Sequence, residues 1–158
     1  MGRTIKGTEN GRGKKIAVVA SRFNEFITQR LLDGCLQELE RCHVGEGDIT
    51  VAWVPGTFEI PVVAKKFAKR KDVHGVICLG AVIRGETTHF ELVAHGGAQG
   101  IMQVALETEK PVIFGVLAVD TVEQAYKRSD DSGDNKGRDA ALAAVEMIDV
   151  MKQAAKAL

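Results

Sequence analysis

A histidine, two threonines and a glycine follow an apolar run in the segment GAVIRGETTH, residues 80–89. If a helix begins there, it presents unpaired backbone N–H groups and the positive end of its dipole, a natural seat for phosphate. Gly85 allows close approach of a ligand to the backbone, and Thr87 and Thr88 add hydroxyl donors. The segment matches neither the P-loop nor the dinucleotide fingerprint. It therefore predicts a site for a small phosphorylated metabolite rather than for ATP or NAD.

His89 falls in the first turn of that expected helix. A helix N-terminus disfavours the imidazolium, which leaves a neutral ring able to accept and pass on a proton. A capping or surface histidine is an equally simple alternative. His43, His74 and His95 do not share this placement.

An aromatic residue and a carboxylate follow two other apolar runs. Phe23, in SRFN at residues 21–24, is either a loop anchor or a stacking platform for a planar ligand. Glu59, in PGTFE at residues 55–59, lies near an expected helix start. It can accept hydrogen bonds from hydroxyls or amides, although dipole stabilisation alone would explain it.

Two cations, Arg128 and Lys136, bracket a polar break that reads SDDSGDN. The arginine fork binds oxyanions bidentately, which suits an incoming phosphate. The neighbouring Asp130, Asp131 and Asp134 favour the alternative that both cations are simply solvated.

The elements that must position these residues follow from the hydropathy pattern. Strands are expected at residues 15–20, 49–54, 73–82 and 111–119, and helices at 25–41, from about 59, at about 88–107, after 121 and from about 138 to 156. Continuous apolar strands alternating with helices predict an α/β sandwich on a parallel sheet. Ligands in such sheets bind beyond the carboxyl ends of the strands. The candidate residues above follow the ends of the expected strands, apart from His43, His74 and His95.

Two helix starts carry an expected capping box, Thr88 with Glu91 and Thr121 with Gln124. The last helix has apolar residues over about half of its circumference, wider than the ~100° stripe that covers one core. We expect part of that surface to be a subunit interface; close packing of a small-residue helix on its own sheet is the alternative.

Composition sets the remaining limits. The 158 residues fit one domain, expected at 15–158 behind a flexible segment 1–14, and Lys+Arg and Asp+Glu both number 21. A net charge of zero provides no global attraction for nucleic acid or anionic membrane. Cys35, Cys42 and Cys78 show no metal-binding pattern and are expected as buried thiols in a reducing compartment. With no signal-peptide core or membrane span, a cytoplasmic protein is expected.

Together these segments resemble the lumazine synthase family. The matching motifs are SRFN (21–24), VPGTFEIP (54–61), LGAVIRGETTHFE (79–91), FGVL (114–117), EQA (123–125) with Arg128, and NKG (135–137) with AA (140–141). They stand in family order from about Lys15 to the C-terminus, and the block at 80–91 is highly specific.

The resemblance implies a flavodoxin-like, three-layer αβα sandwich with a four-stranded parallel sheet. It implies condensation of 5-amino-6-(D-ribitylamino)uracil with 3,4-dihydroxy-2-butanone 4-phosphate, giving 6,7-dimethyl-8-ribityllumazine, phosphate and water, with no cofactor and no metal. By position, the ribitylaminouracil site comprises Phe23, Thr57, Phe58, Glu59, Ala81, Val82, Ile83 and Phe114. The butanone phosphate site comprises Gly85, Glu86, Thr87, Arg128 and Lys136, and His89 moves protons.

The resemblance also implies a homo-oligomer in which Phe114 and Arg128 come from the adjacent subunit. The family-like spacing from Arg128 to Lys136 favours a sixty-subunit shell of pentamers, with riboflavin synthase as a further candidate partner. One departure is the acidic segment SDDS after Arg128, which is expected to weaken phosphate affinity. Two other classes stay open: a non-catalytic flavin- or lumazine-binding relative, and a purely structural shell protein.

Overall fold

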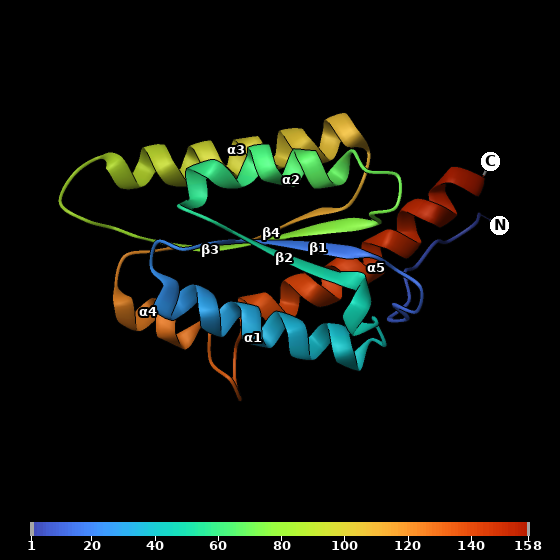
Figure 1. The fold of residues 1–158 in the computed structure, drawn as a ribbon, viewed down its shortest axis with the longest axis horizontal. Coiled ribbons are helices and arrows are strands. Elements are labelled where there is room, and N and C mark those ends of the chain that lie inside the picture. Colours follow the sequence, from blue (N-terminus) through green and yellow to red (C-terminus); the bar gives the residue numbers. More distant parts are fainter. Residues whose placement is uncertain (1, 158) are drawn as a thin grey trace.

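Strands and helices alternate along the chain in the computed structural model, which describes residues 2–157 (Figure 1). The elements are β1 (Ile16–Ser21), α1 (Glu25–Arg41), η1 (Glu46–Asp48), β2 (Ile49–Val54), η2 (Thr57–Glu59), α2 (Ile60–Ala68), β3 (Gly75–Ile83), α3 (His89–Thr108), β4 (Val112–Val119), α4 (Val122–Lys127) and α5 (Lys136–Lys156). Each predicted strand is present within two residues of its expected bounds, and α1 has the expected bounds at both ends.

The four strands form one parallel sheet in the order β2-β1-β3-β4. Helices α2 and α3 cover one face, and α1, α4 and α5 cover the other (Figure 1). The predicted three-layer α/β sandwich is thus confirmed. Its strand order is that of flavodoxin-like folds, in which the order reverses between β1 and β3.

Each face of the sheet has its own hydrophobic core, because alternate residues of a strand point to opposite sides. Ile16 and Val18 of β1 pack with α1 and α5, whereas Ala17 and Val19 pack with α2 and α3. Every residue of β1 is buried, as its continuous apolar run predicted.

The capping box predicted at Thr88 and Glu91 is wrong. Thr88 has φ −74° and ψ 0°, and its side chain caps no backbone N–H. The Glu91 carboxylate pairs instead with Arg84, a charged donor that outcompetes a backbone amide. The capping box at Thr121 and Gln124 is confirmed.

Helix α5 begins two residues earlier than predicted. The Asn135 side chain accepts a hydrogen bond from the Arg138 N–H at 3.0 Å, which places the N-cap at Asn135. Gly137 then lies in the first turn, where a Cβ would stand 1.9 Å from the Leu31 carbonyl oxygen. This close approach packs α5 against α1.

The wide apolar surface of α5 divides into two parts. Ala140, Ala141, Ala144 and Ile148 are buried against the helix's own sheet and α1, as the alternative reading expected. Another group is half-buried or exposed, namely Ala143, Met147, Val150, Met151, Ala154 and Ala155. Only this second group is free to contact another subunit.

The N-terminal segment has no regular structure and runs beside α5 (Figure 1). The Thr8 N–H donates to Asp149 at 3.1 Å, and Glu9 pairs with Arg41 at 2.9 Å. Its predicted flexibility stays a prediction. Within residues 2–157, no helix is long and apolar enough to cross a membrane.

Candidate active site

The carboxyl ends of β1, β2 and β3 meet at a cavity of about 850 Å³. It lies where the strand order reverses between β1 and β3, the usual ligand position in open α/β sheets. Its volume is in the range of small-molecule sites. The lining residues are Phe23, Asn24, Pro55, Gly56, Thr57, Phe58, Glu59, Ala81, Val82, Ile83, Gly85, Thr87, His89, Phe90, Leu92 and Val93.

The turn after β1 holds its backbone firmly and leaves the Phe23 ring free. The Phe23 N–H donates to the Pro55 carbonyl at 2.9 Å. Asn24, in the left-handed region at φ 62°, donates from Nδ2 to the Ala81 carbonyl at 2.8 Å. The Phe23 ring itself is 72% exposed at the cavity wall. A ring held by its backbone and open on its faces can stack on a planar ligand.

The second wall is the short helix η2. Thr57 is buried, while Phe58 and Glu59 are exposed and line the cavity. Gly97 of α3 allows the close contact with η2, because a Cβ there would lie 2.7 Å from the Thr57 methyl carbon. The Glu59 carboxylate forms no ion pair with any group within residues 2–157, so it can accept hydrogen bonds from a ligand.

The third wall is the turn between β3 and α3. His89 is the first residue of α3 and so lies in its first turn, as predicted, and its N–H donates to the Thr87 hydroxyl at 3.3 Å. The backbone N–H groups of residues 85–88 donate to no other group in the described part of the chain. Glu86 belongs to this exposed turn but does not line the cavity. The free backbone donors can hold an anion, and the neighbouring imidazole can exchange a proton with the molecule that carries this anion.

Arg84 stands outside this turn and joins it to two other elements. Its Nε donates to Asp120 at 2.8 Å and its Nη1 to Glu91 at 2.6 Å. Its guanidinium carbon lies 4.4 Å from the centroid of the Phe90 ring. The hydrogen bond from Arg84 lowers the pKa of Glu91, so this carboxylate stays ionised.

Four predicted site residues do not line the cavity: Glu86, in the turn already described, and Phe114, Arg128 and Lys136, which lie away from it. Phe114 is exposed on the edge strand β4. Arg128 and Lys136 line a separate cavity of about 250 Å³ beside the second half of β4, together with Asp134. One chain therefore brings together Phe23, Glu59 and His89, but not the two cations.

The sequence interpretation missed Asn24, Pro55, Gly56, Phe90, Leu92 and Val93. Spacing offered a signal for two of them. Leu92 and Val93 stand three and four residues after His89, and such residues share one face of a helix.

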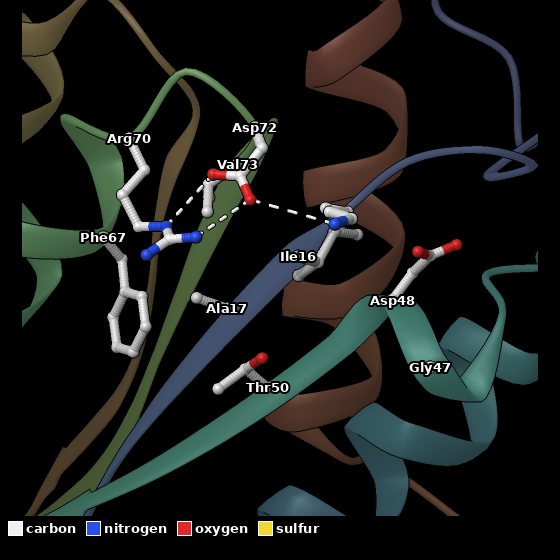
Figure 2. A pocket seen from close by; sticks show the side chains of 10 residues that line it. Ile16, Ala17, Gly47, Asp48, Thr50, Phe67, Arg70, Asp72 and Val73 are labelled. Atoms are coloured by element: carbon white, nitrogen blue, oxygen red, sulfur yellow. Dashed lines mark hydrogen bonds and ion pairs between the residues drawn. The ribbon is translucent and has the colours of Figure 1, made fainter.

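A further cavity of about 240 Å³ lies at the amino ends of the strands (Figure 2). Figure 2 shows three of its charged side chains paired with one another: Arg70 donates twice to Asp72, at 3.0 and 2.9 Å, and Lys15 lies 3.8 Å from Asp72. Asp48 is the remaining charged side chain in its lining, so this cavity has fewer converging free groups than the large one.

Neither a metal site nor a reactive thiol competes with this assignment in the described residues. No three His, Cys, Asp or Glu side chains within residues 2–157 are grouped to hold a metal ion. All three cysteines are buried and unpaired, and burial raises the pKa of Cys35 and Cys78 to about 12. These thiols are packing residues.

Comparison with known families agrees with this arrangement. A model of the family described as 6,7-dimethyl-8-ribityllumazine synthase matches residues 13–152. The match includes all four strands and every residue that lines the 850 Å³ cavity. The chain therefore belongs to the 6,7-dimethyl-8-ribityllumazine synthase family, transferases of riboflavin biosynthesis.

Proposed function

We propose that this protein condenses 5-amino-6-(D-ribitylamino)uracil with 3,4-dihydroxy-2-butanone 4-phosphate in the large cavity. The products are 6,7-dimethyl-8-ribityllumazine, inorganic phosphate and water. The single observation that carries the proposal is that one cavity holds an exposed aromatic ring, an unpaired carboxylate and an imidazole beside free backbone donors.

The pyrimidine occupies the part of the cavity beside β1 and η2. Its ring stacks on Phe23, which is held by its backbone N–H and needs little rearrangement. The ribityl chain runs along η2, where its hydroxyls donate to the Glu59 carboxylate. Ala81, Val82 and Ile83 form the apolar wall at the end of β3.

The butanone phosphate occupies the turn before α3. Its phosphate accepts hydrogen bonds from the unpaired N–H groups of residues 85–88 and is favoured by the helix dipole. Gly85 and Thr87 line this part of the cavity, and the exposed Glu86 flanks it.

The chemistry joins an amine to a ketone, so it requires proton transfers rather than a change of oxidation state. The pyrimidine amino group adds to the carbonyl, and one water leaves as the imine forms. Phosphate then leaves by elimination, and the resulting enol becomes a ketone. The ribitylamino nitrogen attacks this ketone, and loss of a second water closes the ring. His89 accepts the proton released by the attacking amine and returns protons to the leaving groups. Holding both reactants side by side provides most of the rate.

Arg128, Lys136 and Phe114 enter the site from a neighbouring copy of the chain. Within one chain Arg128 lies in a different cavity from His89. The edge strand β4 carries the exposed Phe114, and the exposed Arg128 and Lys136 lie beside it. This surface complements the open cavity of a neighbouring chain. We propose a pentamer, assembled into a shell, in which α5 contributes its exposed apolar residues to subunit contacts.

The test is the absorbance of the lumazine product, formed by purified protein from the two substrates, with native mass measured on the same sample. We expect product and a mass of at least five chains. Binding of the pyrimidine without product would indicate a non-catalytic relative. Assembly without binding would indicate a purely structural shell protein.

A further inference from the structure

Arg84 joins the first turn of α3 to the end of β4 and does not itself line the cavity. Its backbone N–H donates to the Val119 carbonyl at 2.9 Å, which continues the pairing of β3 with β4 by one residue. Its side chain then reaches Asp120, which follows β4, and Glu91 in the first turn of α3. Neither Arg84 nor its carboxylate partners line the cavity.

Residues 85–90, which include the proposed phosphate seat and His89, form the segment between Arg84 and Glu91. Apart from the bond between the His89 N–H and Thr87, the side chains of this turn have few anchors in the described structure. A Cβ on Gly85 would meet nothing within 4 Å, and residues 85–89 are all exposed, so little packs against the turn. Its two ends are fixed by the ion pair of Arg84 with Glu91.

The guanidinium also lies against Phe90, at 4.4 Å from the ring centroid. Phe90 follows His89 and lines the cavity. A cation over an aromatic face holds the ring from outside while its other parts face the ligand. One side chain thus restrains the first turn of α3 at two adjacent points, Phe90 and Glu91.

We propose that Arg84 is a positioning residue for the reaction, which sets the first turn of α3, and with it His89, at a fixed distance from the end of β4. This inference rests on the proposed function. Arg84 acts through His89 and does not touch the substrates.

Direct phosphate binding by Arg84 is the competing role, and charge argues against it. Two carboxylates already bind this one guanidinium, so the group of three has a net negative charge. Neutralising the two carboxylates would therefore strengthen any bond between Arg84 and phosphate. The same change would weaken the link that Arg84 forms between α3 and β4. The two roles predict opposite effects of neutralising Glu91 and Asp120.

The first test compares steady-state kinetics of Arg84→Ala, Arg84→Lys and the double variant Glu91→Gln/Asp120→Asn. We expect kcat to fall about tenfold to a hundredfold in Arg84→Ala, because small displacements of a catalytic group have effects of this size. Arg84→Lys should recover part of the loss, since it keeps one ion pair. The double variant should also lose kcat. A lower KM for the butanone phosphate in the double variant would overturn the proposal in favour of phosphate binding.

Arg70→Ala is the matched control. Like Arg84, Arg70 is an exposed arginine with two charged hydrogen bonds, both to Asp72 (Figure 2), and it lies at the amino ends of the strands. It should leave kcat unchanged. A fall equal to that of Arg84→Ala would show that loss of any such ion pair slows the enzyme, which would overturn the proposal.

The second test uses coupling to His89. In a His89→Ala background, Arg84→Ala should cost much less of the remaining rate than it does in the wild type, because the group that it positions is gone. An equal fold loss in both backgrounds would mark Arg84 as a general structural residue. Failure of the proposed function is seen separately, since the unaltered protein would then form no lumazine at all.

Discussion

Replacement of Phe23 by alanine separates a binding role of this ring from a structural one. Full burial of a phenylalanine side chain contributes about 1.5–3 kcal/mol to folding. Phe23 is 72% exposed, so its contribution to the fold stays below about 1 kcal/mol. Stacking contributes about 0.5–1.5 kcal/mol beyond the area that a planar ligand covers. Phe23→Ala should therefore weaken pyrimidine binding by about 1 kcal/mol or more, roughly fivefold in Kd.

The assay is titration of the protein with the lumazine product or the pyrimidine, beside thermal unfolding of the same samples. Phe26→Ala is the matched control. Phe26 is also partly exposed, at 47%, but it packs near Tyr126 and does not line the cavity. It should alter stability more than affinity. Loss of stability in Phe23→Ala as large as its loss of binding would refute the stacking role and mark the ring as an anchor.

Three further substitutions test other parts of the account. His89→Ala should lower the rate of lumazine formation about a hundredfold or less and keep pyrimidine affinity; a rate unchanged across neutral pH would contradict proton transfer. Gly97→Ala should raise the pyrimidine Kd severalfold by forcing η2 away from α3, whereas Gly47→Ala, which meets nothing within 4 Å, should not. Burial lowers the pKa of His74 below 6.5, because the folded protein disfavours the protonated ring. The contribution of His74 to the free energy of unfolding is therefore highest above pH 6.5 and declines as pH falls from there towards the pKa of the folded state. His74→Asn should flatten this decline in urea unfolding, and an unaltered slope would exclude His74 as its source.

Much of the fold follows from local patterns in the sequence. The apolar spacing of Ile27, Leu31 and Leu39 gave α1 its correct bounds, and the continuous apolar strands predicted a buried parallel sheet. The cap of α3 did not follow, because Glu91 pairs with Arg84 rather than with the backbone at Thr88. Arg84 lies at the end of β3, and its other partner, Asp120, arrives from β4.

The cavity was predictable for a similar reason. Carboxyl ends of neighbouring parallel strands lie together, so Phe23, Glu59 and His89 were expected at one edge of the sheet. The role of Leu92 and Val93 depends on how α3 is rotated about its axis, which packing decides. The position of Arg128 beside β4, apart from His89, depends on the strand order.

The shared site is tested most directly by mixing two defective proteins. His89→Ala and Arg128→Ala chains are unfolded, mixed in equal amounts and reassembled, and lumazine formation is compared with that of each variant treated alone. If Arg128 completes the site of a neighbouring chain, about a quarter of the subunit boundaries pair an intact His89 with an intact Arg128. The account predicts activity above the average of the two pure variants. No gain, with mixed assembly confirmed by native mass, would contradict it.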